Sequence, residues 1–153
     1  MRKLKSLLEP TVNGEVKHNF AYGTLEGMVS NVAFSLVNPF FGVYAIALGA
    51  SSLMVGLLTA IPALVNTIVF IPAAGFVEKR ESRLPTVLFW AGLHRSLYLV
   101  LACIPFMPVA KPVFLVGIVT LMSVPGAISG VAWTAMMGDM FPAEDRGEIF
   151  GLR

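Results

Sequence analysis

The stretch GFVEKRESR, residues 75–83, contains five charged side chains and separates two long apolar segments. Upstream, residues 27–77 contain no Asp, Glu, Lys or Arg. Downstream, residues 84–138 contain only Arg95 and Lys111 as charged residues. Uncharged segments of this length are typical of helices that cross a lipid bilayer, so the sequence predicts an integral membrane protein.

The composition of the whole chain supports this class. Of its 153 residues, 56% are hydrophobic and 13% are charged, and the mean hydropathy is +0.78; soluble domains contain roughly 25% charged residues. As one helix, residues 27–77 would be about 75 Å long, whereas a bilayer core of about 30 Å needs only about 20 residues. The chain must fold back on itself, so we expect an all-α fold, a polytopic bundle of transmembrane helices.

Turn residues divide the chain into a tail and four predicted spans. Residues 1–19 are polar and basic and are expected to form a cytoplasmic tail. The spans are predicted at residues 20–48, 53–77, 84–105 and 113–137, and a fifth begins near residue 147. Pro39 favours a kink in the first span, and Pro85 is expected near the start of the third helix, where its missing N–H has little effect.

Basic residues are distributed unequally between the two sides of these spans. The tail contains four Lys or Arg, the loop after the second span three, and the segment after the fourth span two. The opposite side contains only Lys111. Because Lys and Arg are retained on the cytoplasmic side, we expect a cytoplasmic N-terminus in a plasma membrane or a bacterial inner membrane.

Small and polar residues share one face on three of the predicted helices at 100° per residue. The candidate cavity-lining residues on these faces are Asn31, Asn38, Asn66, Ser123 and Thr134. Two interpretations remain open: the faces pack against neighbouring helices, as the spacing of Gly126 and Gly130 suggests, or they line a water-filled cavity.

Two charged residues lie inside the predicted spans. Arg95 is about 16 Å into the third span, where an arginine is unfavourable by about 2.5 to 3.5 kcal/mol and needs a partner. One interpretation is a structural salt bridge, for example to Glu26, and the other is a role in substrate binding or coupling. Glu26 lies on a different face from Asn31, which argues against one shared ligand site.

The sequence contains no recognisable catalytic constellation. It has no HExxH, no Cys and His spacing for a metal, no phosphate-binding loop and no Gly-x-Ser-x-Gly elbow. The single Cys103 is expected to pack as a small hydrophobe. We therefore expect no enzymatic activity, no cofactor, no metal and no nucleic-acid partner, with the lipid bilayer as the surroundings.

The charged stretch resembles the motif Gly-x-x-x-Asp-Arg-x-Gly-Arg-Arg, which the major facilitator superfamily places between its second and third helices. Gly75, Arg80 and Arg83 match this motif. The chain departs from it at Lys79, where the family has Asp, and also at Ser82 and Leu84.

In the family, the motif Asp takes part in contacts that hold the cytoplasmic gate, and Lys79 reverses its charge. Either Glu78 substitutes from one position earlier, or this chain gates differently. A second stretch is similar to the family's connection from the fourth to the fifth helix, through Asp139, Pro142, Arg146, Gly147 and Gly151.

The resemblance implies a transporter of twelve helices in two six-helix halves that rock about a central site. This chain then forms part of one half, helices one to four and the start of five, and needs the missing C-terminal half. Helices one and four line the central cavity in this family and helix three is peripheral. That arrangement favours Asn31, Asn38, Ser123 and Thr134 over Arg95 as cavity residues.

The expected function is secondary active transport of a small solute by alternating access. An ion gradient is the expected driving force, because the sequence contains no nucleotide-binding motif. The alternative is a small four-helix membrane scaffold or assembly subunit without transport activity.

Overall fold

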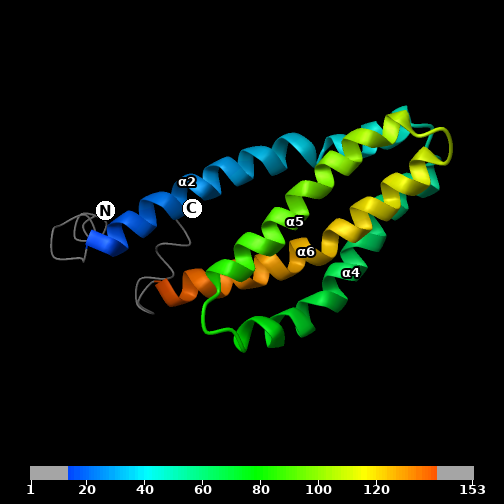
Figure 1. Cartoon of the computed structure of the whole chain (residues 1–153). Helices are drawn as coiled ribbons and strands as arrows, with labels where there is room; N and C mark the ends of the chain where they lie inside the picture. The colour runs from blue at the N-terminus through cyan, green and yellow to red at the C-terminus, as the bar shows by residue number, and fades with distance from the viewer. Residues whose placement is uncertain (1–13, 141–153) are drawn as a thin grey trace. The chain divides into compact units, whose positions relative to one another are not determined.

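The computed structural model describes residues 14–140, and its regular elements in that range are all helical. They are α2 (Gly14–Val37), α3 (Phe40–Ala47), α4 (Ser52–Glu78), α5 (Leu84–Cys103), the 3₁₀ turn η1 (Ile104–Phe106) and α6 (Lys111–Met140) (Figure 1). Within this range, the segments long and apolar enough to cross a membrane are Leu25–Ala47, Ser52–Glu78, Leu84–Phe106 and Lys111–Asp139. The predicted fold class, an all-α polytopic membrane protein, is confirmed.

Two of the predicted segments lie partly or wholly outside the residues that the structure describes. Residues 1–13 of the predicted tail and the predicted fifth span from residue 147 lie outside the described residues. The helix α2 begins at Gly14, within the predicted tail, and α6 begins at Lys111, two residues before the predicted span. Helix boundaries therefore differ from the predicted limits mainly where polar residues extend an apolar helix.

Prolines affect the helices differently according to their position. Asn38 and Pro39 separate α2 from α3, in a region that the sequence suggests is one kinked span. The Asn38 N–H still donates to the Phe34 carbonyl at 2.9 Å. Pro39 has no N–H with which to continue this ladder. Pro62, Pro72 and Pro125 instead lie inside α4 and α6.

Local turn chemistry joins α3 to α4 and begins α5. Gly49 follows the last turn of α3 with a φ of +87°, a left-handed conformation that glycine adopts without a steric penalty. Ser51 then caps α4, because its hydroxyl oxygen accepts from the Met54 N–H at 3.4 Å. Pro85 lies in the first turn of α5, as predicted.

Contacts divide the chain into two compact units, residues 1–38 with 137–153, and residues 39–136. In the first unit, α2 approaches the end of α6 closely at Gly23. A Cβ atom at Gly23 would lie 2.8 Å from Cε of Met137, a buried side chain. A larger residue at this position would therefore displace the Met137 side chain.

In the second unit, α4 and α5 form an antiparallel hairpin that α6 accompanies (Figure 1). Its core lies where the end of α5 and the starts of α4 and α6 meet α3. We call this end of the unit the packed end. Its buried residues are Ala45, Leu58, Leu101, Ile104, Leu115 and Met122. The opposite end carries the loop of residues 79–83, which we call the charged end.

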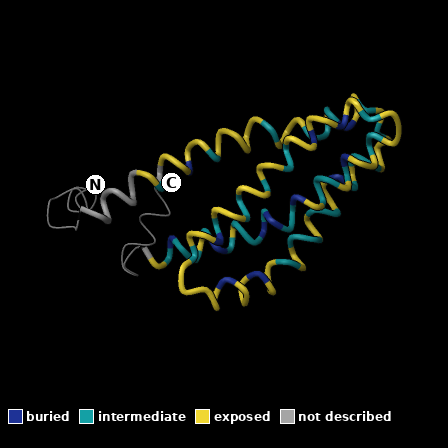
Figure 2. Tube along the Cα trace, viewed as in Figure 1, coloured by how far each residue is buried: buried dark blue, intermediate teal, exposed yellow. Residues whose placement is uncertain are grey.

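Outside this core many helical residues are exposed (Figure 2), and a large share of them are large and apolar. Only 6% of the most apolar window of α4 is buried, and the corresponding share of α5 is 11%. Exposed apolar side chains on this scale would be unfavourable in water but are compatible with lipid chains. The outer surfaces of these helices are therefore suited to a bilayer.

Candidate functional site

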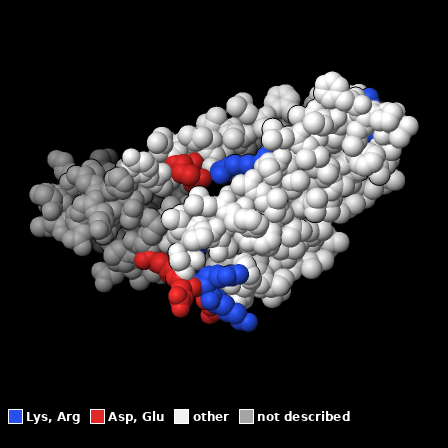
Figure 3. Space-filling view, in the orientation of Figure 1, with Lys and Arg blue, Asp and Glu red and all other residues white. Residues whose placement is uncertain are grey.

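The charged end is built from the last turn of α4 and the first turn of α5. Glu78 is the last residue of α4, Lys79 is its C-cap, and the Arg80 N–H donates to the Val77 carbonyl at 3.1 Å. Arg83 precedes α5 and its carbonyl accepts from the Val87 N–H at 2.9 Å. Figure 3 shows acidic and basic side chains gathered at this loop. The loop thus joins two helix ends whose backbone groups are hydrogen-bonded, and it contains a dense group of charged side chains.

Arg80 has a specific contact on its own helix. Its guanidinium carbon lies 4.5 Å from the centroid of the Phe76 ring, one turn earlier. This is a cation–π arrangement, which restrains the arginine along α4. Gly75 is exposed, and a Cβ atom there would meet no described atom within 4 Å. Packing among the described residues therefore does not require a glycine at position 75.

The candidate polar residues of α4 and α6 lie at different depths. Asn66 is half-buried and shares its face of α4 with the buried Ala73. Ser123 is half-buried, and its hydroxyl donates to the Val119 carbonyl at 3.1 Å. Thr134 is exposed, and its hydroxyl donates to the Gly130 carbonyl at 2.9 Å. Both hydroxyl protons are thus used within α6, which leaves the hydroxyl oxygens as acceptors.

Two candidates, Asn31 on α2 and Asn38 directly after it, belong to the first unit. Asn31 and Asn38 are exposed. Glu26 accepts a hydrogen bond from the Ser30 hydroxyl at 2.6 Å, one helical turn away. Arg95 is an exposed residue of α5 in the second unit. Glu26 and Arg95 thus belong to different units, and the suggested salt bridge between them stays a prediction.

The second loop motif is described only at its first residue. Asp139 lies in the last turn of α6 and is exposed. Pro142, Arg146, Gly147 and Gly151 lie outside the described residues. In the part of the chain that the structure describes, no group of three or more His, Cys, Asp or Glu side chains is placed to hold a metal ion.

Sequence reasoning missed a hydrogen bond between α3 and α5. The Tyr44 hydroxyl donates to the Leu101 carbonyl at 2.9 Å. Four residues after Leu101 stands Pro105, which has no N–H to offer this carbonyl in a regular helix. The proline was the available signal, because without the i+4 donor the Leu101 carbonyl accepts instead from the Ile104 N–H and from the Tyr44 hydroxyl.

Sequence reasoning also missed the role of His94 in helix packing. A Cβ atom at Gly126 of α6 would lie 3.3 Å from Cδ2 of His94 on α5. The His94 ring also meets Tyr98 edge to face, with 5.5 Å between centroids. By contrast, a Cβ atom at Gly130 would meet no described atom within 4 Å. Of these two glycines, only Gly126 gives space to a neighbouring helix among the described residues.

Comparison with protein families matches residues 25–153 to the Major Facilitator Superfamily. Comparisons with curated proteins and with solved structures give no match. The matched range includes the four apolar segments and both loop motifs. The chain therefore belongs to the Major Facilitator Superfamily, and it is an integral membrane protein of the transporter type.

Proposed function

We propose that this chain is the N-terminal part of a secondary active transporter that moves a small solute by alternating access. The observation that carries the proposal is the family match over residues 25–153. In alternating access, two helical halves rock about a central site. The proposal therefore includes a C-terminal half as a partner, and an ion gradient as driving force because the sequence has no nucleotide-binding motif.

The proposed substrate pathway is lined by polar residues of three helices, namely Asn31, Asn38, Asn66, Ser123 and Thr134. Its support is that these polar groups lie within apolar spans and are exposed or half-buried. Polar side chains in contact with water avoid the desolvation penalty of a lipid-facing position. On α6, the hydroxyl oxygens of Ser123 and Thr134 are the groups left to accept from a solute or from water.

The proposed gate is the charged end, facing the cytoplasm. The excess of Lys and Arg on that side of the predicted spans supports the orientation. Arg80 and Arg83 are proposed to fix a helix end there, and Glu78 to supply the negative charge that Lys79 does not. Glu26 and Arg95 are proposed as intramembrane charges, and Arg95 as having either a structural role or a role in substrate binding or coupling.

Labelling of introduced cysteines tests the pathway. In a Cys103→Ser background, Asn66→Cys and Ile71→Cys are compared in membrane vesicles, using a charged maleimide that does not cross lipid. Ile71 is 82% exposed and lies on a different face of α4 from Asn66. Thiols react as thiolates, which need water. We expect Asn66→Cys to be labelled and Ile71→Cys to be protected by lipid.

Protection of both positions would contradict a water-filled pathway and favour the scaffold alternative. Equal labelling of both would mean that α4 has no lipid-facing side, which also contradicts the proposal. Transport itself is expected to need the C-terminal half. Solute uptake by vesicles containing this chain alone would overturn that requirement.

A further inference from the structure

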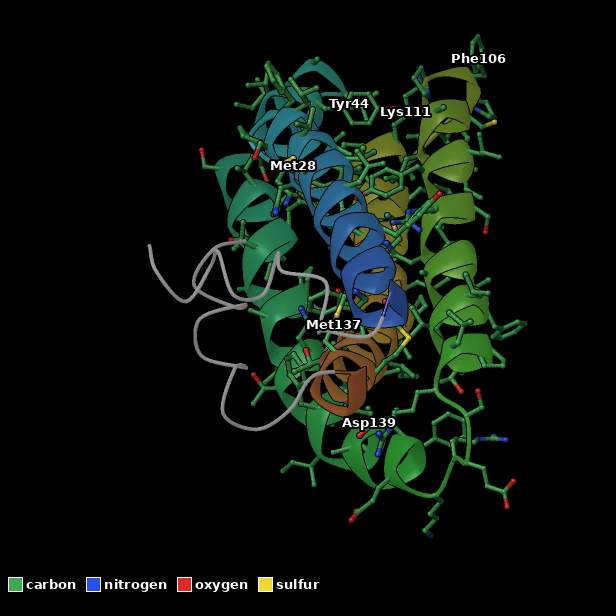
Figure 4. The ribbon with its side chains drawn as sticks, turned by 90° about the vertical axis from the view of Figure 1, so that its left-hand side faces the viewer. Met28, Tyr44, Phe106, Lys111, Met137 and Asp139 are labelled. Atoms are coloured by element: carbon green, nitrogen blue, oxygen red, sulfur yellow. The ribbon has the colours of Figure 1, made fainter. Side chains whose placement is uncertain are left out.

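The turn between α5 and α6 places large apolar side chains at the surface. The Phe106 side chain is 87% exposed and that of Val109 is 68% exposed. Figure 4 shows Phe106 at the end of the helices, with its side chain pointing away from them. An apolar environment at the tip of the turn would remove both side chains from water, which is favourable.

The turn is held in one conformation by several contacts. Ile104, directly before Pro105, is fully buried in the packed end. The Met107 N–H donates to the Ile104 carbonyl at 3.0 Å, and the Lys111 ammonium donates to the Pro105 carbonyl at 2.8 Å. Ala110 adopts a φ of 55°, and its carbonyl accepts from the Val113 and Phe114 N–H groups in the first turn of α6, at 3.0 and 3.1 Å. Exposure of Phe106 is thus a property of an ordered turn.

The position of the turn along the spans identifies its surroundings. The segment Leu84–Phe106 has 23 residues, about 34 Å as a helix, which slightly exceeds a bilayer core of about 30 Å. One candidate span ends at Phe106 and the next begins at Lys111. The turn therefore lies where acyl chains meet lipid headgroups, a level at which aromatic side chains are enriched.

Charge supports the same placement. Lys111 is the only charged residue in residues 96–138, and residues 39–77 contain none. A lysine in the first turn of a helix is disfavoured by the helix dipole. Within residues 14–140, the Lys111 ammonium donates to the Pro105 carbonyl alone, so two of its three N–H groups are available to a further acceptor. A lipid phosphate at this level supplies both the counter-charge and the acceptor oxygens.

We infer that residues 104–111 form a lipid-interface anchor, in which Phe106 and Val109 insert at the acyl-chain boundary and Lys111 binds headgroup phosphate. The anchor depends on membrane insertion and not on the proposed transport function. It fixes the depth of the packed end by contacts with lipid on one side and with the buried Ile104 on the other.

Depth-dependent fluorescence quenching tests the insertion. In a Trp90→Phe, Trp133→Phe background, Phe106→Trp and Leu64→Trp are reconstituted in phosphatidylcholine vesicles brominated either high or low on the acyl chain. Leu64 is 61% exposed in the middle of α4 and provides the deep control. We expect bromines near the headgroup to quench Phe106→Trp most, and bromines near the bilayer centre to quench Leu64→Trp most.

Failure to quench Phe106→Trp with either lipid, while Leu64→Trp is quenched, would overturn the inference: red-shifted emission would place the turn in water, and blue-shifted emission would place it under protein. Circular dichroism establishes that each variant is folded. If Phe106→Trp does not fold, Val109→Trp is measured instead, with the same expected result and the same overturning result.

A lipid-selectivity measurement tests Lys111. At equal bromine content, brominated phosphatidylglycerol in phosphatidylcholine should quench Phe106→Trp about twofold more than brominated phosphatidylcholine does, because an anionic lipid is enriched near the ammonium. Adding Lys111→Gln should make the two lipids equivalent. Equivalence with Lys111 still present would remove headgroup binding from the inference.

Discussion

The two ends of the second unit are held together by different means. At the packed end, large side chains such as Leu58, Ile104 and Leu115 interlock, and the Tyr44 hydroxyl crosses to α5. At the charged end, the buried residues of α4 and α5 are smaller, namely Ala73, Val77 and Thr86. One end therefore depends on side-chain volume and a partly buried hydrogen bond, and the other on backbone hydrogen bonds at helix ends and on surface charges.

The difference shows which forces specify helix pairing inside lipid. Lipid chains are as apolar as leucine, so apolar side chains gain little by leaving lipid for a neighbouring helix. Shape and hydrogen bonds then decide which helices stay together, and the packed end has both. We expect substitutions at the packed end to change stability more than those at the charged end, in the following order.

Leu115→Ala should have the largest effect, because Leu115 is fully buried. Loss of its contacts should lower the free energy of unfolding by about 2 kcal/mol. This is near the lower limit for a buried Leu→Ala substitution, because moving a leucine side chain from lipid into the protein releases little free energy. Equilibrium unfolding in mixed micelles measures this change. Leu121→Ala on the same helix, where the side chain is 52% exposed, is the control, and an equal loss there would contradict the packed end.

Tyr44→Phe should lower the free energy of unfolding by about 1 kcal/mol, since it removes the donor to the Leu101 carbonyl and little else. The matched variant is Tyr98→Phe, because Tyr98 meets His94 through its ring. The same unfolding measurement should show a smaller change for Tyr98→Phe. If the two variants lose equal free energy of unfolding, the hydrogen bond between Tyr44 and Leu101 does not stabilise the packed end.

Gly126→Ala and Gly130→Ala locate where close packing along α6 ends. Alanine in place of a helical glycine is favourable by about 0.5 to 1 kcal/mol where space allows, as at Gly130. At Gly126 the new methyl group must displace His94, so its gain should be smaller or reversed. Thermal unfolding of the two variants measures the difference between their stabilities. Equal stabilisation by both alanines would mean that His94 does not pack closely against Gly126.

Arg80→Gln should have the smallest effect, about 0.5 kcal/mol, because it removes an exposed cation–π contact with Phe76. Lys79→Gln removes the same charge without that contact and serves as the control. Both are measured by unfolding in mixed micelles at low and high salt. A loss for Arg80→Gln as large as that for Leu115→Ala would erase the contrast between the two ends.

Charge distribution was enough to predict the fold class, because a long uncharged segment has few alternatives to a membrane helix. Turn chemistry placed Pro85 at the start of α5 correctly. The exact helix limits were less predictable, since Lys111 and Pro112 read as loop residues but begin α6. Proline tolerates the first helical turn, so it marks the vicinity of a boundary and not its exact position.

Contacts between helices were not predictable from one sequence. A membrane helix is apolar on most sides, so periodicity does not show which face meets a neighbour. His94 and Gly126 illustrate this, because nothing in their spacing pairs α5 with α6 at that level. For the candidate site, the sequence placed Ser123 and Thr134 on one face but not the intrahelical bonds that use their protons.

The Leu101 carbonyl accepts two hydrogen bonds, one from the Ile104 N–H and one from the Tyr44 hydroxyl. A carbonyl with two donors vibrates at a lower frequency than its singly bonded neighbours. Isotopic labelling of this one carbonyl would separate its infrared band from those of the other helical carbonyls. The frequency of that band then reports, in a membrane and with no change of side chain, whether the hydrogen bond between α3 and α5 is formed.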